Sequence, residues 1–263
     1  GLITAEGVAR VRAWYGSPNN LALYLERLVP IALSAAVFGG IGRRRWAYSL
    51  ALLPLVAALY LTFSRGAWLL GLPAALIVMG AARGGKWHWG ALAGILLIGV
   101  MLLPLAGTER LQSLLDTSAG TGFVRLKLWQ GTWNMIREHP VLGVGPDNFL
   151  YLYRTRYVLP SAWEELNLSH PHNIVLDAWT RTGIMGLAAL GVLAVALARR
   201  LWRGARQAEG PAERTLYIGL LGSLAASLAH GLIDNALFLV DLAMVLMMTA
   251  GLAVRLEGPA EER

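Results

Sequence analysis

Arginine and histidine side chains stand at the ends of long apolar stretches, where charged groups are costly and therefore candidates for function. Arg65 lies within a Ser-Arg-Gly turn, Arg125 opens an amphipathic segment, and His170 and His172 flank a proline. Guanidinium groups bind phosphate and pyrophosphate through paired hydrogen bonds, and histidine is suited to taking a proton from a hydroxyl. Together they suit the attack of a hydroxyl on a carbon that carries a pyrophosphate leaving group. The same arginines would otherwise act as interface anchors or attract lipid phosphate.

Other polar residues near these positions favour structural roles. Asp177 and Arg181 are spaced i, i+4, which favours an ion pair within one helix. His230 and Asp234 have the same spacing and the same structural interpretation. Asn173 is suited to cap the helix that follows it.

Other catalytic chemistries find no matching pattern in the sequence. The absence of cysteine excludes thiolate metal sites, iron–sulfur clusters and cysteine nucleophiles. There is no G-x-S-x-G, no H-E-x-x-H and no phosphate-binding P-loop. His170 and His172 would be zinc ligands only with a third ligand, for which Asp147, Glu164 and Glu165 lie nearby without a recognised spacing. We therefore predict neither a metal nor a cofactor.

The composition places the chain in a membrane. Of its 263 residues, 56% are hydrophobic and 15% are charged, and the mean hydropathy is +0.52. Soluble domains average roughly 45–50% apolar and about 25% charged residues. A soluble globular enzyme, a disordered chain and a secreted disulfide scaffold are thereby excluded. We attribute the net charge of +7 to residues that set membrane topology, not to nucleic-acid binding.

Seven apolar intervals are long enough to predict membrane spans. They are residues 28–42, 46–64, 66–82, 87–108, 182–198, 215–233 and 236–254, the first extending back through Leu21 and the last containing Asp241. Alternating spans place the basic clusters after spans one, three and five on one side, which the positive-inside rule identifies as cytoplasmic. Arg65, His172 and the long segment 107–171 then face outward. We predict an all-α, polytopic transmembrane bundle with a large, partly helical periplasmic loop, forming a single domain over residues 1–263.

The outer loop at 107–171 contains one predicted amphipathic helix. Leu126, Trp129, Trp133 and Ile136 recur with the spacing of one helical face. Such a tryptophan-rich helix with basic flanks is expected to lie in the membrane interface.

Several short motifs occur in order along the chain. The most specific is H-[NSQ]-x9-G-x-x-G, read here from His172-Asn173 to Gly183 and Gly186 at the end of the outer loop. Further matches are listed in chain order: Ser64-Arg65-Gly66, Arg125-x3-Trp129, Pro140-x2-Gly143-x-Gly145 and, more weakly, His230-x3-Asp234. In this order and topology they resemble the O-antigen ligase and polymerase family of bacterial membrane glycosyltransferases, over about residues 15–250.

The resemblance implies a reaction and a set of roles. The reaction is the metal-independent, inverting transfer of a glycan from undecaprenyl pyrophosphate to a sugar hydroxyl, at the periplasmic face of the bacterial inner membrane. His172 would be the general base, and Arg65 and Arg125 would bind the donor pyrophosphate. The supporting roles are listed together: Asn173 orients the base or donor, Gly183 and Gly186 allow close helix packing, and Arg181 and His170 are candidates by position alone.

The implied partners are the lipid-linked donor, a glycolipid or polysaccharide acceptor and the lipid bilayer, without nucleic acid. Within the superfamily, a ligase, a repeat-unit polymerase and a protein O-oligosaccharyltransferase are all consistent with these motifs. Outside it, the alternatives are a non-catalytic polyprenyl-lipid or polysaccharide transporter and a structural membrane protein or receptor. A transporter should show interrupted helices in two related halves, which we do not find. Family members usually carry ten or more spans, so we expect further spans before Gly1.

Overall fold

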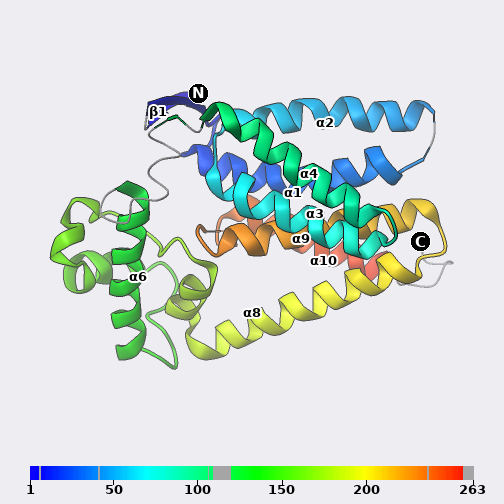
Figure 1. The fold of residues 1–263 in the computed structure, drawn as a ribbon. Coiled ribbons are helices and arrows are strands. Elements are labelled where there is room, and N and C mark those ends of the chain that lie inside the picture. Colours follow the sequence, from blue (N-terminus) through cyan, green and yellow to red (C-terminus); the bar gives the residue numbers. More distant parts are fainter. Residues whose placement is uncertain (6, 41, 106, 109–119, 236, 257–263) are drawn as a thin grey trace. The chain divides into compact units, whose positions relative to one another are not determined.

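The computed structural model describes residues 1–5, 7–40, 42–105, 107–108, 120–235 and 237–256 (Figure 1). Over these residues the chain is helical apart from a β-hairpin, in which β1 (Leu2–Ala5) pairs antiparallel with β2 (Val8–Val11). The all-helical prediction did not include this hairpin. The chain divides into two compact units: the first comprises Gly1–Leu103, Ala196–His230 and Leu237–Arg263, and the second comprises Pro104–Val195 and Gly231–Ala236.

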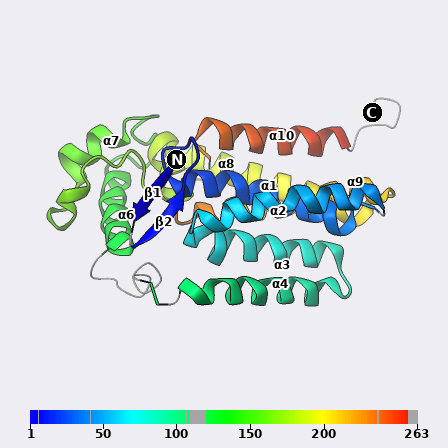
Figure 2. The same ribbon diagram turned by 90° about the horizontal axis from the view of Figure 1, so that it is seen from above.

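The first unit contains most of the apolar helices. Its N-terminal elements are α1 (Pro18–Phe38), α2 (Arg43–Leu61), the π-helix η1 (Ala67–Gly71), α3 (Leu72–Arg83) and α4 (Trp87–Leu102). Helix α1 packs against α2, and α3 packs against α4 (Figure 2). Helices α9 (Pro211–Gly231) and α10 (Val240–Leu256) and the C-terminal part of α8 (Ile174–Gln207) complete the unit. Their buried side chains, among them Leu201 and Leu221, pack with Met79 of α3 in one apolar cluster. A second cluster includes Leu25, Leu59 and Trp68.

Each predicted span falls on a helix, so the positions of the helices agree with the apolar intervals. Helices α1 and α8 are long and apolar enough to cross a membrane, and residues 67–83 and α4 form shorter apolar helices. Helix α8 exposes the apolar side chains of Val192, Leu193 and Val195. This apolar surface suits lipid contact. The number of spans stays a prediction.

The second unit is built around α6 (Gly120–Glu138), followed by α7 (Phe149–Leu152), the π-helix η3 (Tyr153–Tyr157), the 3-10 helix η4 (Pro160–Glu165) and the beginning of α8. Leu128 and Met135 of α6 pack with Phe149, Tyr153 and Tyr157 in its core. Residues 109–119 of the predicted outer loop lie outside the described residues.

The face of α6 that packs inside the second unit differs from the predicted apolar face, which we expect to lie in the membrane interface. Ile136 is buried, but Leu126 and Trp133 remain 49% and 48% exposed. The buried face is centred instead on Leu128 and Gly131. Gly131 explains the shift, because a Cβ at this position would collide with the backbone carbonyl at the end of η3. The helix therefore turns its small residue, and not its tryptophans, toward the aromatic core.

Helix α8 is interrupted at Gly183, which has φ 70° and ψ −172°. The segment after α6 docks onto this break: the Val144 N–H donates to Thr180 O at 2.7 Å, and the Ile184 N–H donates to Pro140 O at 3.2 Å. A Cβ on Gly183 would fall on the carbonyl of Val141. The close neighbour of Gly183 is thus a loop, in contrast to the predicted helix-to-helix contact.

Gly186 also has a local neighbour. A Cβ on Gly186 would meet the side chain of Thr182, one turn earlier in the same helix. The hydroxyl of Thr182 donates to Ala178 O at 2.7 Å within the segment of α8 that precedes the break. Gly186 therefore leaves room for the side chain of Thr182 at the break in α8.

Candidate active site

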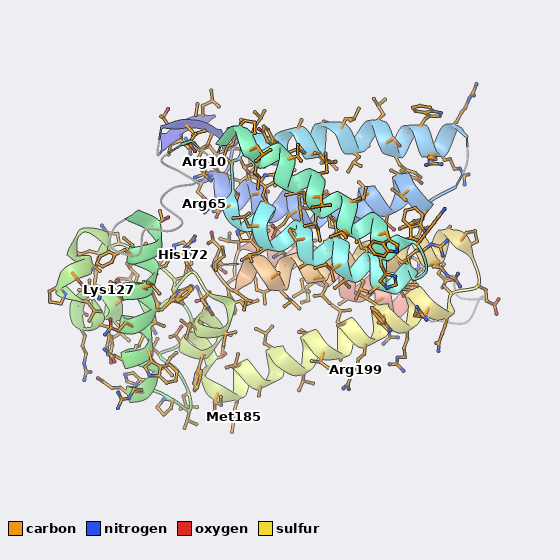
Figure 3. All side chains as sticks on the ribbon, viewed as in Figure 1. Arg10, Arg65, Lys127, His172, Met185 and Arg199 are labelled. Atoms are coloured by element: carbon orange, nitrogen blue, oxygen red, sulfur yellow. The ribbon has the colours of Figure 1, made fainter. Side chains whose placement is uncertain are left out.

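His172, labelled in Figure 3, is hydrogen-bonded to Asp234. The distance between His172 Nδ1 and Asp234 Oδ1 is 2.7 Å, and the exposed fractions of the two side chains are 25% and 3%. Asp234 lies just after α9, and the Asn235 N–H donates to the same Oδ1 atom at 2.8 Å. A carboxylate that accepts a hydrogen bond from Nδ1 fixes the tautomer whose Nε2 atom carries the lone pair. The imidazole is thus oriented as a base.

Arg125 shares the same carboxylate. Its Nη2 atom lies 3.4 Å from Asp234 Oδ2, and its side chain is 23% exposed. Helix α6 therefore contributes a guanidinium group to the site, while the segment before α8 contributes the imidazole. Asp234 joins the two, since each of its oxygens faces one of them. The structure thus brings together two of the predicted site residues, Arg125 and His172.

The segment that carries His172 is held at several points. His172 has a φ of 49°, a left-handed conformation that is strained for a residue with a side chain. Trp129 Nε1 donates to Pro171 O at 2.8 Å. Asn173 Oδ1 accepts from the N–H groups of Val175 and Leu176 at 3.0 and 3.1 Å, and Asn173 Nδ2 donates to a carbonyl beyond α9 at 2.8 Å. The predicted capping role of Asn173 is confirmed, and the same side chain also ties α8 to the region of Asp234.

His170 lies beside His172, with 4.3 Å between the ring centroids. Desolvation by burial, helped by the neighbouring His172, lowers the pKa of His170 to about 4. His170 is therefore neutral at physiological pH and supplies a polar wall, not a positive charge. Ser169 Oγ is 3.0 Å from its Nδ1 atom.

His170, His172 and Asp234 together form a possible metal-binding group, because their donor atoms lie within 4.8 Å of one another. Two imidazoles and a carboxylate are suitable ligands for several transition metals. In this arrangement, however, the Asp234 oxygens already face the Nδ1 atom of His172 and the guanidinium of Arg125. A metal ion on this carboxylate would have to displace one of these contacts, so the geometry fits an oriented base better.

Arg181 has a structural environment. Its Nε atom donates to Asp177 Oδ1 at 2.9 Å, which confirms the predicted i, i+4 ion pair. Its Nη1 atom donates to Asp147 Oδ1 at 2.8 Å. Asp147 has a φ of 61° and belongs to the segment that docks onto the break in α8. Arg181 therefore holds that segment against the start of α8, the helix that begins directly after the His172 segment.

Arg65 belongs to the first unit, whereas Arg125 and His172 belong to the second. Within the first unit, Arg65 follows a turn that Arg10 of β2 holds (both labelled in Figure 3). Arg10 Nε donates to Thr62 O, and Arg10 Nη2 donates to Asn19 Oδ1, both at 2.7 Å. The hairpin that sequence reasoning missed thus carries a residue that fixes the turn before Arg65.

Both residues of the predicted His230–Asp234 pair have partners outside the pair. His230 Nδ1 is 2.8 Å from Glu26 Oε2 in the first unit, while Asp234 binds His172 in the second. Asp234 is a candidate site residue to which the sequence reasoning gave only a structural role. Its available signal was the weak His230-x3-Asp234 similarity, which marked the position without indicating its partner.

The fold and the site define a helical membrane protein with an oriented histidine beside an arginine. The profile of the O-antigen ligase family (Wzy_C) matches residues 50–191, which is more than half of the chain. The chain belongs to this family. It is also 34% identical over 162 residues to an O-antigen ligase of Salmonella typhimurium, a match that covers 55% of this chain and 38% of the relative. The matched region is thus little more than a third of that protein. The family supports a glycan-transfer function in general.

Proposed function

We propose that this protein transfers a glycan from an undecaprenyl-pyrophosphate donor to a sugar hydroxyl, as an O-antigen ligase-like, inverting glycosyltransferase. The observation that carries the proposal is the shared carboxylate of Asp234, which lies 2.7 Å from the Nδ1 atom of His172 and 3.4 Å from the Nη2 atom of Arg125. One base and one cation are thereby held side by side. These are the two groups that the reaction requires.

In the proposed reaction, Nε2 of His172 takes the proton from the acceptor hydroxyl. The acceptor oxygen forms a bond to the anomeric carbon while the bond between this carbon and the pyrophosphate oxygen breaks. The electron pair of the broken bond leaves with the lipid pyrophosphate, and Asp234 stabilises the imidazolium that forms. A single displacement of this kind inverts the configuration at the anomeric carbon.

The leaving pyrophosphate needs compensation of its negative charge. Arg125 is suited to this role, because a guanidinium presents five N–H donors and its contact with Asp234 occupies only one edge. Arg65 is proposed as a second donor-binding residue on the resemblance of its Ser-Arg-Gly turn to the family pattern. With arginines in this role the reaction needs no metal ion, and it would take place at the outer face of the inner membrane.

The test is a transfer assay with the full-length protein in lipid nanodiscs, an undecaprenyl-pyrophosphate-linked glycan and a glycolipid acceptor, with EDTA present. His172→Ala is expected to lower the transfer rate by about 10²-fold or more while donor binding persists. His139→Ala, at the end of α6, is the matched control. Undiminished transfer by His172→Ala would contradict the base role, and loss of activity in EDTA would contradict the metal-free reaction.

The acceptor decides between the related activities. A repeat-unit polymerase would extend a lipid-linked glycan, and a protein O-oligosaccharyltransferase would modify serine or threonine, with the same histidine as base. A non-catalytic transporter would move the donor across the bilayer without forming a product. Supplying each acceptor separately to the same preparation therefore separates these alternatives.

A further inference from the structure

A buried pair of ionisable residues lies in the first unit and has no part in the chemistry above. His230, near the end of α9, and Glu26 of α1 are hydrogen-bonded at 2.8 Å between Nδ1 and Oε2, although 204 residues separate them. Their side chains are 1% and 0% exposed. Ionisable groups buried in an apolar helical bundle are costly, and in a membrane protein they usually mark a functional position.

The pair packs directly against the segment that begins with the Ser64-Arg65-Gly66 turn. A Cβ added to Gly66 would fall on the imidazole of His230, at its Nε2 and Cδ2 atoms. A Cβ added to Gly71 would fall on Oε2 of Glu26. The two partners of one hydrogen bond therefore each occupy the space above one glycine. Any larger residue at either glycine would push the pair away.

The π-helix η1 explains how two glycines five residues apart reach the same pair. In an α-helix, residues 66 and 71 would point about 140° apart, because each residue turns the chain by about 100°. The N–H of Leu72 instead donates to the carbonyl of Ala67, the i→i+5 bond of a π-turn. The wider turn brings both glycines to the face that meets Glu26 and His230.

We propose that Glu26 and His230 are positioning residues that hold the Ser-Arg-Gly turn and thereby set the affinity of Arg65 for the donor pyrophosphate. This inference rests on the proposed function of Arg65 in donor binding. Arg65 directly precedes Gly66, so a displacement of Gly66 by the loss of the buried pair also displaces the guanidinium. The pair itself touches no substrate and acts through the turn.

The first experiment compares donor affinity among single variants of the full-length protein, with undecaprenyl pyrophosphate as the probe. His230→Ala is expected to raise the Kd and the KM for the donor by about tenfold, the loss of roughly one charge-assisted hydrogen bond, with little change in kcat. His230→Asn, whose amide can still donate to Glu26, retains most of the affinity. Ser227→Ala, one turn earlier on α9 and bonded only within that helix among the described residues, is the matched control.

The second experiment uses double variants to connect the pair to the turn. The double variant Arg65→Ala/His230→Ala is expected to bind the donor no more weakly than Arg65→Ala alone. His230 acts only through the contact between Arg65 and the donor, which Arg65→Ala has already removed. Gly66→Ala is expected to weaken donor binding, and His230→Ala in the same chain removes the collision and restores part of it. Gly99→Ala on α4, with open space at its Cβ position, controls for the change of residue type.

Two results would overturn the inference, and they differ from each other. If His230→Ala lowers the unfolding temperature but leaves the donor Kd of the folded protein unchanged, the pair is purely structural. If Arg65→Ala itself leaves the donor Kd unchanged, the donor-binding role of Arg65 fails, and the positioning role falls with it.

Discussion

The Nδ1 atom of His172 lies 2.7 Å from the Oδ1 atom of Asp234, although 62 residues separate the two in the chain. This contact joins the segment before α8 to the turn after α9. The carboxylate accepts at least three hydrogen bonds, from the Nδ1 atom of His172, the Nη2 atom of Arg125 and the main-chain N–H of Asn235. A carboxylate has enough lone pairs to accept all three, whereas an amide does not.

Asp234→Asn is therefore expected to lower kcat by about 10²- to 10⁴-fold, because the amide nitrogen must face either His172 or Arg125, both of which donate. Where it faces His172, the imidazole loses its productive tautomer. The KM for the donor should change much less than kcat. The measurement is steady-state transfer with donor concentration varied. Glu138→Gln, a partly exposed carboxylate of the same unit that pairs with Arg156, is the control. A kcat equal to that of the unmodified protein would remove the role of Asp234 in orienting the base.

Trp129→Phe tests whether the His172 segment needs its anchor. The change removes the N–H that donates to Pro171 O at 2.8 Å and keeps an aromatic ring in place. We expect a stability loss of about 1 kcal/mol and a clear fall in kcat, because His172 loses a support next to its strained backbone.

Trp179→Phe is the matched comparison for Trp129→Phe, since Trp179 Nε1 donates to Pro140 O at 2.9 Å in the other docked segment. It should lower the unfolding temperature by a similar amount while kcat stays closer to normal. Equal losses of kcat in both variants would show that Trp129 supports only the fold of the unit.

Local patterns in the sequence were enough to predict the local structure of the site. The apolar intervals located the helices, Asn173 was identified as a cap, and the i, i+4 spacing of Asp177 and Arg181 gave a correct ion pair. Each of these depends on one continuous stretch of chain, and the cap and the ion pair depend on residues within one helical turn, where geometry follows directly from spacing. The same rule could not identify the partners of His230 and Asp234 that come from α1 and from the segment before α8.

Periodicity alone could not predict which face of α6 packs inside the protein. The pattern gave the correct element, and it grouped the tryptophans on a face that we expect to contact the membrane interface. The aromatic core formed by Phe149, Tyr153 and Tyr157 instead selects the face on which Gly131 permits close approach. Which face packs is decided by the shape of the partner, and that partner is unknown until the fold is known.

Gly183→Ala tests the break in α8. Alanine at a φ of 70° is strained by about 1–3 kcal/mol, and its Cβ would also collide with the Val141 carbonyl. We expect a lower unfolding temperature together with loss of transfer, because the docked segment and the His172 segment both depend on the start of α8. Gly191→Ala, later in the same helix with nothing near its Cβ position, should be neutral or stabilising by up to about 1 kcal/mol. Equal stability of both variants would contradict the role assigned to the break.

The partly buried His170 should make stability depend on pH. Its pKa is lowered from 6.5 to about 4 in the folded protein, mainly by desolvation. Between these values the unfolded chain binds a proton that the folded protein does not. The free energy of unfolding therefore falls as the pH is lowered from about 6.5 toward about 4 and is fully retained above 6.5.

His170→Gln removes this titration, so its unfolding temperature should fall less than that of the unmodified protein between pH 7.5 and pH 5. The measurement is thermal unfolding in detergent at several pH values, with the difference between the two proteins taken at each pH so that other titrating groups cancel. Ser169→Ala removes the hydroxyl beside Nδ1 but leaves the ring buried, and it should keep the pH dependence because desolvation is the main cause of the lowered pKa. Parallel curves for His170→Gln and the unmodified protein would show that His170 can take up a proton in the folded state at little cost, and its role as a neutral wall beside His172 would be lost.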